Sequence, residues 1–277
     1  MSHPTLPIIR LRPNAEVRAI RHGFPWVYSN ELVTDRRTKA LAPGTFAILE
    51  DTERRQMGVV AVNTSSKIIA RMMDRDPRAV IDQSWYAARL SQALDHRTRL
   101  YDQPYYRLVH AESDGLPGVV IDRFGDTAVV QPNAAWSDLH LDTLVAALMD
   151  VTGITNVIKN GAGRARKLEG LTEETVILQG NADAPVPVHM NGATYMADVM
   201  GGQKTGLFYD QRPNHAFAAS PPPAASPTSP PSSCPGCWPA RSPLPWAADG
   251  AISCPARPAA RKAARAAAAT GRKANLK

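Results

Sequence analysis

Short alternations of apolar and polar residues dominate the first 77 residues and predict β-strands. These runs are rich in Ile and Val, and turn residues such as Pro43-Gly44 separate them. The predicted strands are Pro7–Arg12, Trp26–Tyr28, Phe46–Glu50, Met57–Val62 and Ile68–Met73. One or two helical turns are expected over residues 14–21. Residues 1–77 are therefore expected to form a small β-barrel.

A helical pattern then replaces the alternation. Val80–Tyr101 is predicted as a helix whose apolar stripe contains Trp85, Leu90, Leu94 and Leu100. This helix opens a domain over residues 78–184, for which the pattern predicts a strand-strand-helix-strand-strand unit. Ser137 is the expected N-cap of its second helix, and Gly153 follows the end of that helix. The segments are strands Arg107–Ala111, Gly118–Arg123 and Thr127–Pro132, helix Ser137–Val151, and strands Asn156–Lys159 and Glu174–Gln179.

Residues 185–220 are expected to hold a hairpin and a lead-in to a further domain. The hairpin pairs Val186–Met190 with Ala193–Asp198 and turns at Asn191-Gly192, a dipeptide that favours tight hairpin turns. The fold class that follows is α+β.

The composition changes abruptly after residue 220. Residues 221–277 contain 12 Pro and 16 Ala, and their only aliphatic residues larger than Ala are Leu244, Ile252 and Leu276. Such a segment buries too little apolar area to offset the entropy of ordering it. The sequence therefore predicts a disordered, low-complexity tail.

Most of the net charge belongs to this tail. Residues 221–277 carry eight Lys and Arg and one acid, 8 − 1 = +7, which equals the formal charge of the whole chain. Residues 1–110 carry 17 basic and 11 acidic groups, 17 − 11 = +6, and residues 111–220 carry 7 and 13, 7 − 13 = −6. A polyanionic partner is therefore expected to meet the N-terminal segment.

The cysteines suggest no disulfide in the first 220 residues, because all three (Cys234, Cys237 and Cys254) lie in the tail. Cys234 and Cys237 have zinc-knuckle spacing, but chance explains it better in this composition, and no metal site is predicted. The sequence has no apolar run long enough for a membrane span and no signal-peptide layout at Met1. A cytoplasmic protein is the expectation.

Three segments carry a resemblance to a known family. They are His22–Glu31 (HGFPWVYSNE), Glu112–Arg123 (ESDGLPGVVIDR) and Gly202–Arg212 (GQKTGLFYDQR). Their order and spacing resemble the PUA domain, the central domain and the lead-in to the catalytic domain of RlmI/RlmK-type large-subunit ribosomal RNA methyltransferases. The resemblance covers roughly residues 7–219.

The resemblance implies an RNA-holding PUA domain, a central domain and a Rossmann-like domain that uses S-adenosylmethionine to methylate cytosine at C5. In that chemistry a cysteine thiolate adds to C6 of the base and later leaves. The resemblance further implies ribosomal RNA as the partner and a homodimer.

The chain departs from the family pattern after Ala219. Pro221–Ser226 (PPPAAS) stands where the family has a strand and a glycine-rich turn that cradles the cofactor. The Rossmann-like domain is therefore expected to be started but not completed, with no family cysteine nucleophile and no cofactor bound by this chain. A frameshift near codon 220 is the hypothesis, and translating the locus in all three frames tests it. A return to the original frame near Ala248-Asp249-Gly250 is the alternative.

Two groups of residues are candidates for binding. The resemblance places four residues beside the cofactor cleft: Lys204, Asp210, Gln211 and Arg212; capping and pairing at a domain junction is the alternative. Nine basic residues of the expected barrel are predicted to contact RNA phosphates, with a merely solvated surface as the alternative: Arg10, Arg12, Arg18, Arg21, Arg36, Arg37, Lys39, Arg54 and Arg55. His22 and Trp26 are expected to stabilise the fold.

Three functional hypotheses remain open. The chain is a member of a methyltransferase lineage without turnover of its own, a PUA-type module that binds RNA without chemistry, or the product of a disrupted gene.

Overall fold

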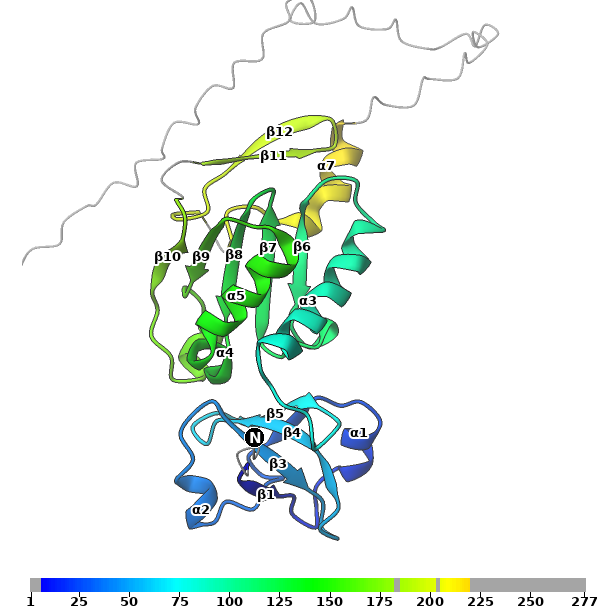
Figure 1. Ribbon diagram of the computed structural model, residues 1–277, viewed down its shortest axis with the longest axis vertical. Helices are drawn as coiled ribbons and strands as arrows, with labels where there is room; N and C mark the ends of the chain where they lie inside the picture. Colours follow the sequence, from blue (N-terminus) through cyan, green and yellow to red (C-terminus); the bar gives the residue numbers. More distant parts are fainter. Residues whose placement is uncertain (1–5, 182–184, 203–204, 220–277) are drawn as a thin grey trace, which may run out of the picture. The chain divides into compact units, whose positions relative to one another are not determined.

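The computed structural model describes residues 6–181, 185–202 and 205–219. The predicted tail, residues 221–277, lies outside the described residues. The first part is a five-stranded sheet in the order β1-β3-β4-β5-β2, with β1 parallel to β3 and the other pairs antiparallel (Figure 1). Its strands are β1 (Ile8–Arg10), β2 (Trp26–Tyr28), β3 (Thr45–Glu50), β4 (Gln56–Val62) and β5 (Ile68–Asp74).

Two short helices complete this part, which we call the barrel domain. They are α1 (Val17–Arg21) and α2 (Arg36–Lys39). Ile20 of α1 is 1% exposed and packs with apolar residues from the strands, such as Ile9, Val27 and Leu49. Asp35 caps α2 by accepting a hydrogen bond from Thr38 N at 2.8 Å. The alternation in the sequence thus predicted every strand of the barrel domain to within three residues, but it did not predict α2.

The second part, which we call the central domain, consists of a mixed sheet in the order β10-β9-β8-β7-β6 and the helices that pack on it. Helices α3 and α5 pack against each other, and their buried side chains share one core with the sheet (Figure 1). The elements are α3 (Gln83–Thr98), β6 (Tyr105–His110), η1 (Ala111–Asp114), β7 (Val119–Phe124), β8 (Thr127–Pro132), α4 (Ala135–Leu139), α5 (Leu141–Thr152), β9 (Asn156–Asn160), α6 (Arg164–Leu168) and β10 (Thr175–Gln179).

The helices of the central domain differ in detail from the prediction. The helix expected over Ser137–Val151 is two helices that meet at His140, and Ser137 lies inside α4 instead of capping a helix. The Ser137 hydroxyl instead donates to Ala134 O at 2.8 Å. Gly153 ends α5 in the left-handed conformation, φ 68°, as its position predicted.

Helix α3 is shorter than predicted, but most of its expected apolar stripe packs against the core. Leu90 is buried, and Trp85 and Leu94 are partly buried against the same cluster. Tyr86 and Ala93 are buried as well, four residues before and three after Leu90, which places them on one face. Only Leu100 departs from the prediction: the helix ends at Thr98, and Leu100 beyond it is 63% exposed.

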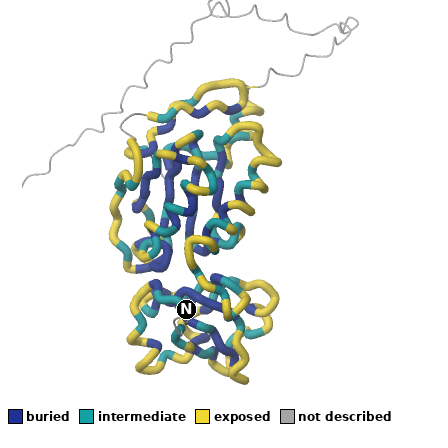
Figure 2. The backbone as a smooth tube through the Cα atoms, viewed as in Figure 1, coloured by how far each residue is buried: buried dark blue, intermediate teal, exposed yellow. Residues whose placement is uncertain are grey.

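The rest of the described chain packs onto the central sheet. It consists of β11 (Val186–Met190), β12 (Ala193–Ala197), η2 (Tyr209–Gln211) and α7 (Arg212–Ala219). The β11–β12 turn places Asn191 and Gly192 at φ 53° and 73°, as expected for this dipeptide. Val188 and Ala197 share a buried cluster with Phe124 and Ile158 of the sheet, so the hairpin belongs to the core of the central domain (Figure 2).

Candidate nucleic-acid interface

Three of the nine predicted RNA-contacting residues form ion pairs around the β3–β4 turn. Arg21 and Arg55 both pair with Asp51, and Arg10 pairs with Glu50 at 3.0 Å. Burial alone would raise the pKa of Asp51, but hydrogen bonds from Arg55 and Glu53 outweigh it and lower that pKa. Asp51 is therefore a carboxylate that organises the turn, and these arginines are partly neutralised by their own domain.

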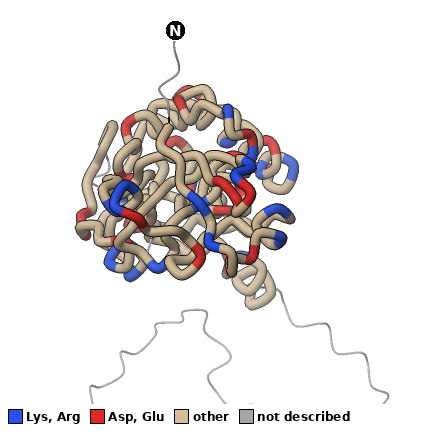
Figure 3. The backbone as a smooth tube through the Cα atoms, turned by 90° about the horizontal axis from the view of Figure 1, so that it is seen from below, with Lys and Arg blue, Asp and Glu red and all other residues tan. Residues whose placement is uncertain are grey.

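The other predicted residues are more available. Arg18 on α1, Arg36 and Lys39 on α2, and Arg54 in the turn are exposed and form no ion pair with any described residue. Arg37 is also exposed on α2, while Arg12 donates to Leu32 O at 2.8 Å. Viewed from the barrel end, basic and acidic residues alternate over the surface without forming one continuous basic face (Figure 3). The exposed cations of α2 are thus the clearest candidates for phosphate contacts.

A buried polar network joins the barrel domain to the central domain. Glu169, 5% exposed, accepts from Ser66 Oγ at 2.8 Å, from Asn63 Nδ2 at 2.9 Å and from Arg71 at 3.0 Å. The Asn63 amide also donates to the Glu169 carbonyl at 3.0 Å. Because Asn63, Ser66 and Arg71 come from the barrel domain, this one carboxylate holds three of its side chains.

A second carboxylate, Glu112 in η1, holds the edge of the same interface. It accepts from the Trp26 indole N–H at 2.7 Å and from Arg71 at 3.1 Å. The expectation that Trp26 stabilises the fold is thus confirmed. His22, in contrast, is exposed. It is the C-cap of α1, where its backbone N–H donates to carbonyl groups of the helix.

Close backbone contact completes the junction between the two domains. Gly44 lies at φ +91°, and a Cβ atom there would lie 2.9 Å from the carbonyl oxygen of Ala135. Beside it the Phe46 ring stacks on His140 with centroids 4.7 Å apart. The residues that pair across this junction are 41 to 106 positions apart in the chain, so no local pattern indicated them.

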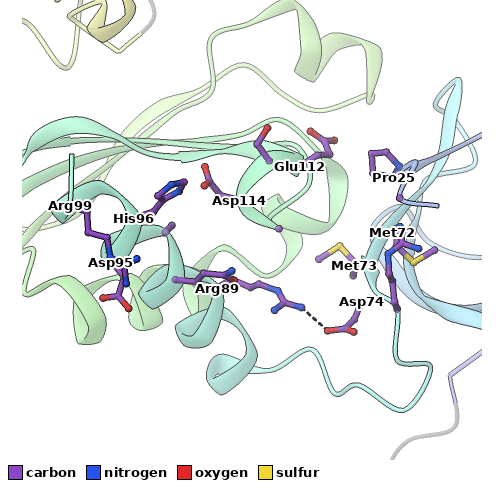
Figure 4. A pocket seen from close by; sticks show the side chains of 16 residues that line it. Pro25, Met72, Met73, Asp74, Arg89, Asp95, His96, Arg99, Glu112 and Asp114 are labelled. Carbon is purple, nitrogen blue, oxygen red and sulfur yellow. Dashed lines mark hydrogen bonds and ion pairs between the residues drawn. The ribbon is translucent and has the colours of Figure 1, made fainter. Parts of the chain in front are cut away.

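A cleft of about 790 Å³ opens along the barrel domain, α3 and η1 (Figure 4). Its barrel side includes Gly23, Pro25 and Asp74, and its α3 side includes Arg89, His96 and Arg99. Asp74 accepts from Arg89 and from the Trp85 indole, at 2.8 and 2.7 Å. The charges of Asp74 and Arg89 therefore neutralise each other, while His96 and Arg99 are exposed.

The predicted cofactor-side segment is attached to the central sheet. Thr205 Oγ1 donates at 2.6 Å to Asp122, a fully buried carboxylate that also pairs with Arg107 at 2.8 Å. Tyr209 OH donates to Arg123 O at 2.7 Å, and burial raises the pKa of that hydroxyl.

Of the four residues predicted beside the cofactor, Lys204 lies outside the described residues. Arg212 donates to Tyr105 O at 2.6 Å and covers the Tyr101 ring at 4.7 Å, and Gln211 accepts from Asn214 at 2.8 Å. Asp210 is exposed. Arg212 thus attaches this segment to the central domain, as a junction residue would, while the contact of Gln211 stays within the segment; a role of any of them toward a cofactor stays a prediction.

The described residues contain neither a metal-binding cluster nor a membrane-spanning helix. No group of His, Asp and Glu there could hold a metal ion, and the three cysteines fall outside them. Within the same residues, no helix has both the length and the apolar content that crossing a bilayer requires.

Comparison with known proteins connects this geometry to a family. Residues 9–75 match a family model described as a PUA-like domain. The ribosomal RNA large subunit methyltransferase I of Alteromonas mediterranea is 34% identical over 212 residues, which cover 76% of this chain and 53% of that protein. Over about three quarters of its length the chain is similar to ribosomal RNA large subunit methyltransferases.

A second relative matches a similar share of the chain. The ribosomal RNA large subunit methyltransferase of Deinococcus radiodurans is 34% identical over 229 residues, 77% of this chain and 55% of its own length. The chain therefore spans about half the length of the curated relatives it matches. The resemblance carried by the three motifs is confirmed at this level.

Solved structures share the fold. A protein from Streptococcus mutans named "a putative SAM-dependent methyltransferase" superimposes with a TM-score of 0.63 at 17% identity, covering 76% of this chain and 54% of that one. A methyltransferase-like protein solved in complex with SAH superimposes with a TM-score of 0.62 at 16% identity. Over the described residues, the predicted α+β class with a PUA-like domain followed by a central domain is confirmed.

Proposed function

We propose that this chain is the RNA-holding part of an S-adenosylmethionine-dependent ribosomal RNA methyltransferase. The observation that carries the proposal is the set of exposed cations on α1 and α2 of a PUA-like domain, with Arg18, Arg36 and Lys39 free of ion pairs to the described residues. Unpaired surface cations gain the most from phosphates, because binding RNA releases the counterions condensed on it.

The interface built on Glu169 and Glu112 supports this role. Buried hydrogen bonds and ion pairs hold the barrel domain against the central domain. RNA bound to the barrel domain is therefore held in a defined orientation relative to the segments that follow the central domain. Positioning of this kind is what a methyltransferase needs from a domain that does no chemistry.

A salt titration tests the RNA-holding role. We expect the full chain to bind large-subunit ribosomal RNA in filter assays with an affinity that falls as salt rises. Replacing Arg36 and Arg37 by Gln is expected to flatten the slope of log affinity against log salt by about 0.7–0.9 per lost phosphate contact.

The matched control removes two charges from the central domain, by R164Q with K167Q on α6. We expect this variant to retain the parent slope. An affinity that does not respond to salt, or an equal loss in both variants, would argue against phosphate contacts by α2.

We also propose the reaction of the whole protein: methyl transfer to C5 of a cytosine in ribosomal RNA. We propose that it takes place in the cytoplasm and in a homodimer, and that this chain lacks the cofactor-binding and turnover steps. The composition of residues 221–277 supports that last point, because this Pro- and Ala-rich sequence contains no Val, Phe, Tyr or Met and no glycine-rich motif of the kind that binds a cofactor.

Calorimetry with S-adenosylmethionine separates a methyltransferase from an RNA-binding module. We expect no heat of binding; micromolar binding would show that the chain holds the cofactor after all. The nucleotide sequence around codon 220 tests the frameshift hypothesis, because a second frame encoding a strand, a glycine-rich loop and a later cysteine would support it. An intact single frame there would end that hypothesis.

A further inference from the structure

We infer that Phe24 and Tyr28, held by Trp26, form a stacking platform for unpaired RNA bases near the cleft lined by residues of β5, α3 and η1. The inference rests on the proposed RNA-holding function and names the part of the RNA that this surface receives. It adds a base-contacting site to the phosphate contacts proposed for α2.

The three rings form one cluster on β2 and the residues before it. The Trp26 ring meets Phe24 and Tyr28 edge-on, with centroids 5.9 and 6.5 Å away, and the outer two rings are 6.2 Å apart. Trp26 is fixed by its indole hydrogen bond to Glu112, which Arg71 also contacts. The cluster is therefore anchored at its centre to the central domain.

The two outer rings are available to a ligand. Phe24 and Tyr28 remain 39% and 38% exposed, although aromatic side chains gain strongly from burial. Exposed apolar residues scattered singly need no explanation, but adjacent ones mark contact surfaces. A rigid pair of aromatic faces is what bases stack on in proteins that bind single-stranded nucleic acid.

Charged side chains of both signs line the cleft that begins next to Phe24 in the chain. Gly23 and Pro25, the neighbours of Phe24, both line it. Three of the four carboxylates that line it are already paired: Asp74 with Arg89, Glu112 with Arg71 and Asp114 with Arg97. Only Asp95 among them forms no ion pair with a described residue.

The cations of the cleft are less committed than its carboxylates. His96 in the last turn of α3 and Arg99 at its C-cap are exposed, and Arg75 is exposed while donating to Ile20 O at 2.9 Å. None of the three forms an ion pair with a carboxylate in the described part of the chain. What the cleft offers to an anionic ligand is therefore this set of exposed basic side chains; His96 and Arg99 are labelled in Figure 4.

This combination favours unpaired RNA over a duplex. In an A-form helix the base faces are stacked on one another and the deep major groove excludes side chains, whereas loops and bulges expose their bases to stacking. Duplex RNA could use the phosphate contacts alone. The platform should therefore raise the affinity for loops and leave the affinity for duplexes unchanged.

Fluorescence anisotropy with the full chain tests the inference. The probes are a labelled RNA hairpin with an unpaired loop and a perfect RNA duplex with the same number of nucleotides. We expect F24L with Y28L to weaken hairpin binding on the order of tenfold or more and to leave duplex binding unchanged.

Two controls make the result specific. The exchange F24Y with Y28F keeps both rings and should bind the hairpin like the parent, which separates lost stacking from a disturbed fold. F217L removes an 85% exposed aromatic residue on α7 and should leave both affinities unchanged. Equal losses for hairpin and duplex, or no loss for either, would overturn the platform.

The two proposals fail in distinguishable ways. If R36Q with R37Q flattens the salt dependence while F24L with Y28L leaves hairpin binding unchanged, the RNA-holding function stands and the platform is wrong. If the parent chain binds neither RNA, both proposals fall together.

Discussion

The barrel domain carries charged side chains on two surfaces, and the two surfaces use them differently. Toward the central domain, Arg71 lies between Glu112 and Glu169, and the Arg71 side chain is 12% exposed. On the outer surface, Arg36 and Lys39 of α2 are exposed and have no ion-pair partner among the described residues. Buried charges must be satisfied within the fold, whereas exposed charges remain free for a partner. Burial, more than residue type, therefore separates the arginines that hold the structure from those that can hold RNA.

The largest expected effect is the loss of the buried carboxylate at the domain junction. Replacing Glu169 by Ala leaves Arg71, Asn63 and Ser66 without a shared acceptor, and should lower the free energy of unfolding by about 3–5 kcal/mol. Urea unfolding of the full chain measures it. The matched control is E173A, which removes a 40% exposed carboxylate paired with Lys167 and should cost no more than about 1 kcal/mol. Equal costs would mean that burial does not distinguish the two surfaces.

A smaller effect is expected from closing the backbone approach at Gly44. A Cβ atom there meets the Ala135 carbonyl at 2.9 Å, and φ +91° is strained for any other residue. G44A should therefore destabilise the chain by about 1–3 kcal/mol. G192A is the control, because Gly192 also has a positive φ, 73°, but open space around its Cβ position. A cost for G44A no greater than that for G192A would show that packing at the junction contributes nothing beyond backbone strain.

A weaker, pH-dependent effect is expected from His140, which stacks on Phe46 at the same junction. Burial lowers the pKa of His140 below its ordinary 6.5, so the folded state resists its protonation. Its contribution to stability is then complete above pH 6.5 and declines as the pH falls through the lowered value. H140F should reduce the loss of stability between pH 7.5 and 5.5 in thermal unfolding. An identical pH profile for the parent and the variant would contradict the assignment.

The smallest effect on stability is expected from the outer surface. R36Q with R37Q should change the free energy of unfolding by no more than about 0.5 kcal/mol, because both side chains are exposed. The same variant is expected to change the salt dependence of RNA binding. Loss of stability comparable to that of E169A would show that α2 is part of the structural framework and not a free binding surface.

Much of the fold follows from local sequence. The alternation of apolar residues predicted β2 and β8 at their observed limits, and Asn191-Gly192 predicted the hairpin turn, because each depends on the backbone preferences of a few neighbouring residues. The three motifs predicted the family in the same way, since they are contiguous stretches of chain.

Local sequence missed two helix limits: α3 stops at Thr98, before Leu100, and Ser137 lies within α4, where its hydroxyl donates back to Ala134 O. It failed more broadly where a distant segment decides the outcome. The nine barrel cations looked equivalent in sequence, yet Arg10, Arg21 and Arg55 are paired and the α2 cations are not. The candidate platform was missed because the exposure of Phe24 and Tyr28 cannot be deduced from an aromatic-rich strand.

By itself the sequence determined the class of the protein: its strands and helices, its PUA-like beginning and a basic front ahead of an acidic middle. Only the tertiary structure decided which charged side chains are buried and paired inside the fold. Asn63 and Glu169 are 106 positions apart, and Trp26 and Glu112 are 86 apart. Whether a charge is buried and paired depends on which segments meet in space. Backbone preferences act over a few residues and cannot encode such meetings, so the division between structural and ligand-facing charges appears only in the folded chain.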